Sequence, residues 1–267
     1  MNAPSPAPEV TAVIPDLKGK AVLITGASTG IGAAAARAFG RNGAKVAVNF
    51  NASREEAEAV AADIEASGGQ AVLIQDDVTQ PEAAGRIMAA AVRAFGRIDV
   101  LVNNAGALVK RTPIDQYTDD FVDAVLELNV KQVVRFMRDG AVQMRKQGGG
   151  GSIINVSSIA ARHGGGPGSV IYAAAKGFIA TATRGWAKEL VKDGIRVNAV
   201  SPGVIATPFH DRYSTAEQLA AMQTTIPMNR IGAPEECVGA FLYLASEQLS
   251  GYVTGQIIEV NGGQYMP

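Results

Sequence analysis

The sequence contains little of what several classes of protein require. Cys237 is the only cysteine among 267 residues, which excludes an internal disulfide and a cysteine-based metal cluster. The two histidines, His163 and His210, are far apart and lack a pattern of neighbouring carboxylates, so we expect no metal. The formal net charge of −1 offers no field that would attract nucleic acid or an acidic membrane surface, and we expect neither as a partner.

Long hydrophobic runs are missing as well. No apolar run is long enough to span a bilayer, and the N-terminal segment lacks the basic-then-apolar pattern of a signal peptide. These absences predict a cytoplasmic protein. Residues 1–17 are rich in proline and alanine and poor in large apolar side chains, which predicts a disordered N-terminal tail.

Apolar runs alternate with amphipathic stretches through the rest of the chain, residues 18–267. The expected strands cover residues 21–25, 46–49, 71–75, 100–103, 152–156, 196–200 and 256–260. The expected helices cover residues 33–41, 55–66, 82–95, 119–146, 172–191 and 234–246. Strands that alternate with helices pair in parallel, and helices cover both faces of such a sheet. The pattern predicts a single α/β domain built on a doubly wound parallel sheet.

A glycine-rich turn follows the first expected strand and opens the first expected helix. Gly26, Gly30 and Gly32 are spaced T-G-x-x-x-G-x-G, which allows a tight reversal and close approach of a ligand to the backbone. The N-terminus of the helix then offers unpaired N–H groups to a pyrophosphate. A glycine-rich segment alone is more often a plain turn, but its place between a strand and a helix predicts a dinucleotide site.

Tyr172 and Lys176 lie four residues apart in an expected helix, so they share one face. Two unit charges ~5 Å apart at an effective dielectric of ~20 interact by roughly 3 kcal/mol, which is about two pKa units. A lysine ammonium at that distance lowers the pKa of the phenol towards the working pH, where the phenol exchanges a proton with a substrate oxygen. The alternative is a pair of surface residues, the usual role of Tyr and Lys at this spacing.

Several short motifs follow one another along the chain in a specific order. They are Thr25-Gly-Ala-Ser-Thr-Gly-Ile-Gly32, Asn103-Asn-Ala-Gly106, Asn129, Ser158, Tyr172-Ala-Ala-Ala-Lys176 and Pro202-Gly203. In this order the chain resembles the short-chain dehydrogenases/reductases over residues 19–263, most of all the 3-oxoacyl-carrier-protein reductases and the sugar and polyol dehydrogenases. The resemblance implies a Rossmann-type dinucleotide-binding oxidoreductase domain over residues 18–267.

The implied activity is an NAD(P)(H)-dependent interconversion of a secondary alcohol and a ketone by hydride transfer, on a small-molecule substrate. The chain looks like a 3-oxoacyl reductase, and the alternatives are a sugar or polyol dehydrogenase or a non-catalytic nucleotide-binding sensor. An intact set of catalytic residues argues against the sensor, since such a protein would be expected to lose Tyr172 or Lys176.

By similarity, four residues carry catalysis: Asn129, Ser158, Tyr172 and Lys176. Ser158 would hydrogen-bond the substrate oxygen, and Tyr172 would exchange its proton. Lys176 would lower the pKa of Tyr172 and hold the ribose hydroxyls, while Asn129 would position a water leading to Lys176. Ser158 is chosen over Ser157 because the family pattern carries its serine just before the apolar pair that residues 159 and 160 match.

The resemblance also implies the residues that hold the cofactor. Asp77 and Val78 would contact the adenine, and Ile205 and Thr207 the nicotinamide carboxamide. The full implied set along the cofactor is Gly26, Ser28, Thr29, Gly30, Ile31, Gly32, Asp77, Val78, Asn104, Ala105, Gly106, Tyr172, Lys176, Pro202, Gly203, Ile205 and Thr207.

The end of the second expected strand bears on the choice between NAD(H) and NADP(H). Asn49-Phe50-Asn51 carries no carboxylate that would bind a ribose 2′-hydroxyl or repel a 2′-phosphate. Ser53 and Arg54 follow, and Arg54 could pair with that phosphate. Alternatively, Ser53 only caps the next helix together with Glu56. We expect NADP(H) to be favoured, with NAD(H) possible.

Residues 205–228 correspond to the mobile lid that covers the substrate in similar enzymes. Basic groups in or near this region are Lys110, Arg111, His163, His210 and Arg212, which suggest a polar or anionic substrate unless they are merely solvated. In similar enzymes the helices corresponding to residues 119–146 and 172–191 form a dimer interface, and the C-terminal region forms a second one. The expected assembly is therefore a homotetramer.

Overall fold

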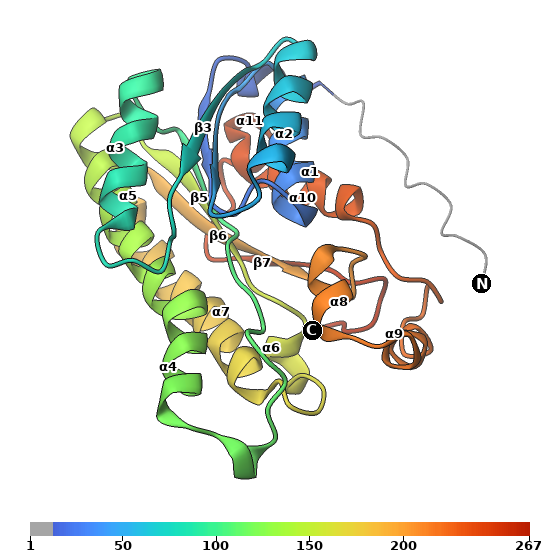
Figure 1. The fold of residues 1–267 in the computed structure, drawn as a ribbon. Coiled ribbons are helices and arrows are strands. Elements are labelled where there is room, and N and C mark those ends of the chain that lie inside the picture. Colours follow the sequence, from blue (N-terminus) through green and yellow to red (C-terminus); the bar gives the residue numbers. More distant parts are fainter. Residues whose placement is uncertain (1–12) are drawn as a thin grey trace.

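A parallel sheet forms the centre of the computed structural model, which describes residues 13–267 (Figure 1). Its seven strands are ordered β3-β2-β1-β4-β5-β6-β7, and every neighbouring pair is parallel. The strands are β1 (Ala21–Ile24), β2 (Lys45–Phe50), β3 (Gln70–Gln75), β4 (Val100–Asn103), β5 (Gly151–Val156), β6 (Ile195–Pro202) and β7 (Ile257–Val260). The doubly wound fold predicted from the alternating pattern is confirmed.

Helices cover both faces of the sheet. One face packs against α1 (Gly30–Arg41), α2 (Arg54–Ala66) and α10 (Val238–Ala245). The other packs against α3 (Ala83–Phe95), α5 (Gln132–Gln147) and α7 (Val170–Leu190). Because the central strands are buried on two sides, they are not alternately apolar and polar, and all four residues of β1 and of β4 are buried.

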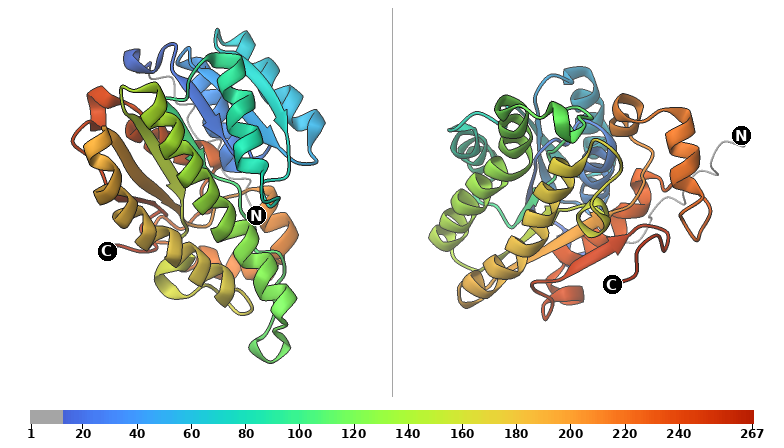
Figure 2. Two further views of the ribbon diagram at one scale, coloured as in Figure 1. Left: turned by 90° about the vertical axis from the view of Figure 1, so that its left-hand side faces the viewer. Right: turned by 90° about the horizontal axis from the view of Figure 1, so that it is seen from below.

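The strand order reverses between β1 and β4. From β1 the chain continues outward to β2 and β3, and then it crosses back to β4 on the other side of β1. At such a switch point the loops beyond the carboxyl ends of the two strands diverge, which leaves a crevice for a ligand. Two further helices, α8 (Pro208–Tyr213) and α9 (Ala216–Gln223), lie apart from both helical layers at this end of the sheet (Figures 1 and 2).

The helix expected over residues 119–146 is not continuous α-helix. The chain forms α4 (Asp119–Leu126), a π-helical turn (Glu127–Lys131) and then α5. Asn129 lies in the π turn, is fully buried, and donates from Nδ2 to Val125 O at 2.9 Å and to Ala107 O at 2.8 Å. Residue spacing alone could not reveal this, because a π turn keeps an apolar face while widening the helix by one residue.

Short elements were also missed by the pattern. The 3-10 turns Pro15–Leu17, Ile114–Gln116 and Val191–Asp193 and the helices α6 (Ala160–His163), α8, α9 and α11 (Glu247–Ser250) are too short for a periodic signal. The helix expected over residues 234–246 begins with a 3-10 turn, Pro234–Cys237, before α10. The predicted tail lies mostly outside the described residues, but Leu17 is fully buried and Asp16 accepts hydrogen bonds from Ser246 and Gln248. These last tail residues therefore belong to the folded domain.

Within residues 13–267, no helix has both the length and the apolar character needed to cross a membrane.

Candidate active site

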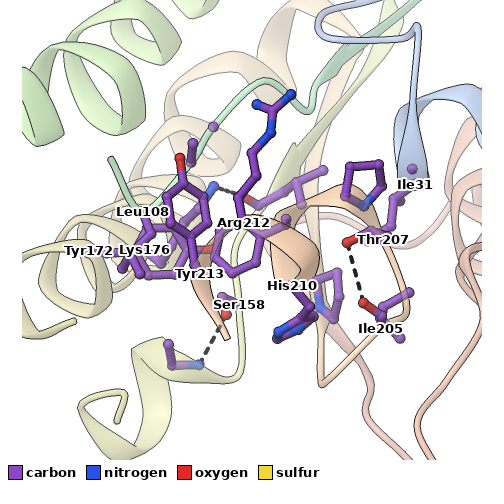
Figure 3. Close-up of a pocket in the computed structure, with 18 of the residues that line it drawn as sticks. Ile31, Leu108, Ser158, Tyr172, Lys176, Ile205, Thr207, His210, Arg212 and Tyr213 are labelled. Carbon is purple, nitrogen blue, oxygen red and sulfur yellow. Dashed lines mark hydrogen bonds between the residues drawn. The ribbon is translucent and has the colours of Figure 1, made fainter. Parts of the chain in front are cut away.

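A cleft of about 890 Å³ opens where β1, β4, β5 and β6 end. In Figure 3, Tyr172, Lys176 and Ser158 gather at one side of this cleft, and Ile31, Thr207 and Ile205 lie at the other. The predicted cofactor residues that line it are Gly26, Ser28, Thr29, Gly30, Ile31, Gly32, Asp77, Val78, Asn104, Ala105, Gly106, Tyr172, Lys176, Pro202, Gly203, Ile205 and Thr207. Residues far apart in the sequence thus meet at the switch point.

The glycine-rich turn has a backbone that only glycine supports well. Gly26 and Gly30 have φ angles of +61° and +56°, which strain any residue with a side chain. A Cβ atom on Gly32 would lie 2.4 Å from the carbonyl oxygen of Gly26. Thr29 precedes α1 without a capping hydrogen bond from its side chain, so the first-turn N–H groups face the cleft unpaired. This end of α1 fits a pyrophosphate.

The turn after β4 is fastened to the glycine-rich turn. Asn104 donates from Nδ2 to the carbonyl oxygens of Thr25 and Gly26, both at 2.9 Å. The backbone N–H groups of Asn104 and Ala105 both donate to Thr25 Oγ1 at 3.0 Å. The two loops therefore form one rigid unit, which explains the role of the Asn-Asn-Ala-Gly motif at this site.

Two predicted cofactor residues are not brought into the cleft. Ser53 and Arg54 are absent from its lining, and Arg54 hydrogen-bonds Gln75, pairs with Glu58 at 3.5 Å and lies over the ring of Phe50. Ser53 is the N-cap residue of α2, although its side chain makes no capping hydrogen bond. The residue of this region that does line the cleft is the uncharged Asn51, together with the buried Asn49 behind it.

The two neighbouring serines have different partners. Ser157 is buried and donates from Oγ to Lys176 O at 2.9 Å, so its hydroxyl fastens α7 to the end of β5. The hydroxyl of Ser158 accepts from the N–H of Ala160 at 3.1 Å, lines the cleft together with Tyr172, and lowers the pKa of that phenol. Of the two, only Ser158 is therefore arranged to share a substrate oxygen with Tyr172.

Burial decides the ionisation of Tyr172 and Lys176 in the protein without cofactor. It raises the pKa of Tyr172 to about 12, and the hydrogen bond from Ser158 offsets this only in part. Burial also lowers the pKa of Lys176 to about 8. Lys176 Nζ donates to Val156 O at 2.9 Å and lies 5.8 Å from the centre of the Tyr172 ring. The expected lowering of the tyrosine pKa is thus wrong for this state, because the cost of desolvating a charge exceeds the attraction within the pair.

Asn129 lies behind the cleft rather than in its lining. Its Oδ1 atom is buried and has no hydrogen-bond partner among residues 13–267. A Cβ atom placed on Gly106 would lie 2.8 Å from this oxygen and 3.0 Å from Lys176 Nζ. Asn129 Oδ1 and Lys176 Nζ therefore both lie close to the backbone of Gly106, which has no side chain to separate them from it.

The substrate end of the cleft is made of side chains from α8, α9 and distant loops. The Phe209 ring lies 5.7 Å from that of Tyr172 and 5.1 Å from that of Tyr213. Of the basic residues named from the sequence, Arg111, His163, His210 and Arg212 line the cleft, whereas Lys110 is exposed outside it. Burial and the charge of Arg111 lower the pKa of His210. Sequence reasoning missed Leu108, Phe209 and Tyr213, since no spacing signal marks residues in short lid helices.

This fold and this site define a class of protein: an oxidoreductase that binds a dinucleotide beside a Tyr–Lys–Ser group. The comparisons agree with that class. A family model described as "Enoyl-(Acyl carrier protein) reductase" matches residues 26–264. The chain belongs to the short-chain dehydrogenase/reductase family, and it is an NAD(P)-dependent oxidoreductase that acts on CH–OH groups.

Relatives that are named as enzymes align with nearly the whole chain. It is 39% identical over 251 residues to L-rhamnose 1-dehydrogenase (NAD(P)(+)) of Sphingomonas sp. strain SKA58, covering 94% of this chain and 98% of the relative. It is 39% identical over 250 residues to the 3-oxoacyl-acyl-carrier-protein reductase of Synechocystis sp. strain PCC 6803, with the same coverage. A crystal structure of a short-chain type dehydrogenase/reductase from Mycobacterium marinum superposes with a TM-score of 0.89 at 37% identity, covering 94% of this chain and 98% of that one.

Proposed function

We propose that this protein interconverts a secondary alcohol and a ketone, with Tyr172 as the residue that moves the proton. The observation that carries the proposal is that Tyr172, Ser158 and Lys176 line one side of the cleft, with Lys176 Nζ 5.8 Å from the centre of the Tyr172 ring. When bound, the nicotinamide supplies the hydride for ketone reduction or accepts it in alcohol oxidation. Tyr172 and Ser158 both donate hydrogen bonds to the ketone oxygen, and Tyr172 gives up its proton as that oxygen gains charge.

The proton must return to Tyr172 after reduction. Lys176 holds the ribose hydroxyls and, when charged, stabilises the phenolate that remains. Asn129 Oδ1 has no hydrogen-bond partner among residues 13–267 and lies, like Lys176 Nζ, close to Gly106, which supports a water there that carries the proton towards solvent.

Replacing single hydroxyls tests this mechanism. Tyr172→Phe should lower kcat by roughly a thousandfold or more, in the upper part of the range for loss of a general acid, while the ring still packs against Phe209 and cofactor still binds. Ser158→Ala should be severe and Ser157→Ala mild. The measurement is consumption of NADPH or NADH with a panel of ketones, together with cofactor binding by fluorescence. Turnover by Tyr172→Phe within a few-fold of the parent would exclude the assignment, and a parent that binds cofactor but reduces no ketone would favour the sensor.

For the cofactor, we propose that NADP(H) is the better substrate and that NAD(H) is also used. Support comes from the end of β2, where the residue in the cleft is the uncharged Asn51; the acidic residues of the lining, Asp76 and Asp77, follow β3 instead. Arg54 contributes less than expected from the sequence, because its guanidinium is engaged with Gln75 and Glu58. Measuring kcat/KM with NADP(H) and with NAD(H) tests which cofactor is preferred.

Two substrate classes remain candidates. Reduction of a 3-oxoacyl group is suggested by the likeness to the Synechocystis enzyme, and oxidation of a sugar or polyol by the likeness to the Sphingomonas enzyme. Gln218, Thr225 and Gln264 line the substrate end, and amide and hydroxyl groups there favour a hydroxylated substrate. A panel of acyl thioesters and aldoses distinguishes the classes.

We also propose that residues 205–228 act as a lid and that four copies assemble. The lid segment contains α8 and α9, which lie outside the helical layers.

For the assembly, two exposed apolar side chains are Val142 on α5 and Phe178 on α7, which are 59% and 45% exposed. Apolar side chains there suit an interface between copies. Hydrogen exchange with and without ligands tests the lid, and light scattering of the parent and of Phe178→Glu tests the tetramer. The cytoplasmic location stays a prediction, tested by cell fractionation.

A further inference from the structure

An arginine without a carboxylate partner stands at the substrate end of the cleft. Arg111 follows β4, is half-buried and lines the cleft. Its Nε donates to Tyr213 O at 2.6 Å and its Nη1 to Pro167 O at 3.0 Å. Both acceptors are neutral carbonyl oxygens. Among residues 13–267, no carboxylate lies within 4.0 Å of this guanidinium, so its charge is not compensated within the described part of the chain.

Other arginines with little exposure are paired. Arg162 forms an ion pair with Glu259 at 2.8 Å, Arg135 pairs with Glu127, and Arg196 contacts Glu247 at 3.3 Å. Removing a guanidinium from water without an opposite charge costs free energy, and burial indeed lowers the pKa of Arg111. These arginines have a carboxylate partner within the fold. Arg111 has none among residues 13–267 and faces the cleft, so an anionic ligand can supply the missing negative charge.

The surroundings of Arg111 add positive charge and no facing acid. Arg212 of α8 also lines the cleft and forms no ion pair among the described residues. It lies between the two groups of site residues in Figure 3. The acidic residues in the cleft lining are Asp76 and Asp77, which follow β3 at the adenosine end. Asp211 is exposed and lies outside the lining. The substrate end is therefore electropositive although the whole chain has a net charge of −1.

Arg111 is held in place by its two carbonyl contacts and still has donors to spare. Its Nη2 atom makes no hydrogen bond with the described residues, and Nη1 uses one N–H of two. A guanidinium fixed by backbone carbonyls loses little conformational entropy on binding, and its planar fork matches the two oxygens of a carboxylate. A neutral sugar would leave these donors and the charge unmatched.

We propose that Arg111, supported by Arg212, binds a carboxylate of the substrate, so that the preferred substrates are ketones or secondary alcohols bearing a carboxylate. This rests on the proposed alcohol–ketone function of the cleft. Phe209 sets the spacing: its ring contacts Tyr172 on one side and Tyr213 on the other, and Tyr213 O is the partner of Arg111 Nε. The rings of Phe209 and Tyr213 therefore separate the bound carboxylate from the reacting carbon beside Tyr172, so the two groups of the substrate are not adjacent.

The test uses matched pairs of substrates that differ in charge only. Short keto acids and hydroxy acids with increasing separation between the two groups are compared with their methyl esters, using the full chain and both cofactors. A charge-assisted hydrogen bond is worth roughly 1.5–3 kcal/mol, or about ten- to a hundredfold. We expect the best acid to exceed its ester by that factor in kcat/KM. Arg111→Gln should remove this advantage through KM and leave the esters within about threefold.

Controls separate charge from lid position. Arg93→Gln on the exposed face of α3 makes the same change in net charge away from the cleft and should alter neither series. Arg111→Lys keeps the charge but cannot make both carbonyl contacts, and should retain part of the preference for acids. Arg212 makes no hydrogen bond or ion pair with residues 13–267, so Arg212→Gln should reduce acid turnover by a smaller factor without lowering the melting temperature.

Three results would overturn the proposal: esters as good as acids in the parent, equal losses for acids and esters in Arg111→Gln, or loss of the acid preference in Arg93→Gln. If neutral ketones are reduced but no acid is, this inference fails while the oxidoreductase function stands. If no ketone of either kind consumes cofactor, both fail together. If Arg111→Gln does not fold, Arg212→Gln and Arg111→Lys decide the question by the same comparison of acids and esters.

Discussion

The two halves of the cleft are built in different ways. The cofactor half is made mainly of backbone: glycines with positive φ, the open N-terminus of α1 and two turns fastened through Thr25 and Asn104. The substrate half is made of side chains on short helices and loops, with Phe209 packed between Tyr172 and Tyr213. Backbone contacts recognise what all dinucleotides share, whereas replaceable side chains determine which alcohol or ketone is accepted.

This contrast predicts that a small change damages the cofactor half most. Gly32→Ala should weaken cofactor binding by roughly a hundredfold, because overpacking against the Gly26 carbonyl at 2.4 Å costs about 1–3 kcal/mol and displaces the turn. The measurement is the cofactor Kd by fluorescence titration. Gly239→Ala in α10 is the matched control, since its new Cβ would meet nothing within 4 Å. Equal, small effects of the two changes would mean that the turn is not shaped for a ligand.

A single negative charge introduced in the cofactor half should change its preference between NADP(H) and NAD(H). Asn51→Asp places a carboxylate at the end of β2, in the cleft, where it repels a 2′-phosphate and accepts from a ribose hydroxyl. We expect kcat/KM for NADP(H) to fall about ten- to a hundredfold and that for NAD(H) to stay within a few-fold or rise. Arg54→Ala serves as the comparison and should have the smaller effect, because Arg54 is held by Gln75 and Glu58. A larger loss with Arg54→Ala would show that this side chain swings to the phosphate.

Lys176 lies where the two halves meet, and its ionisation should be visible in stability. Its pKa in the folded protein is about 8 against 10.5 in the unfolded chain, so between these values the unfolded chain binds more protons. The free energy of unfolding should therefore rise with pH, by about 2 kcal/mol between pH 8 and pH 10. Above pH 10 the raised pKa of Tyr172 acts in the opposite direction, since the unfolded phenol then loses its proton first.

Denaturant unfolding of the cofactor-free protein across this range checks the expectation. Lys176→Met removes the titrating group and should flatten the rise from pH 8 to pH 10. Lys188→Met, on the exposed face of the same helix, should leave it unchanged. Parallel curves for the parent and Lys176→Met would mean that Lys176 is not desolvated in the folded protein.

The smallest effect is expected from the substrate half. Phe209→Ala removes the ring between Tyr172 and Tyr213, and should raise KM for the substrate about tenfold, within the range for losing an aromatic contact and its buried area. The cofactor Kd should not change, because Phe209 belongs to α8 and not to the fastened turns. A parallel loss of cofactor affinity would show that the two halves are coupled and that the contrast between them is too simple.

Local patterns in the sequence were enough for the layered fold and most of the cofactor half. Each strand, and each long helix except the one expected over residues 119–146, was predicted to within a few residues, because apolar runs and helical periodicity act over short distances. Gly26, Gly30 and Gly32 could be assigned to one turn because their function depends on backbone angles and close approach within a single segment. The π turn at Asn129 and the short helices α6, α8 and α9 have no such local signature.

By itself the sequence determined the doubly wound sheet, the glycine-rich turn and the pairing of Tyr172 with Lys176 on one helix face. Only the tertiary structure decided how those groups ionise and which charges face the cleft. Tyr172 has a raised pKa rather than a lowered one because neighbouring segments bury it. Among residues 13–267 no carboxylate pairs with Arg111 at the substrate end, and Arg54 hydrogen-bonds Gln75, through contacts made across the fold. Desolvation and charge pairing depend on residues distant in the chain, and spacing along a sequence does not contain that information.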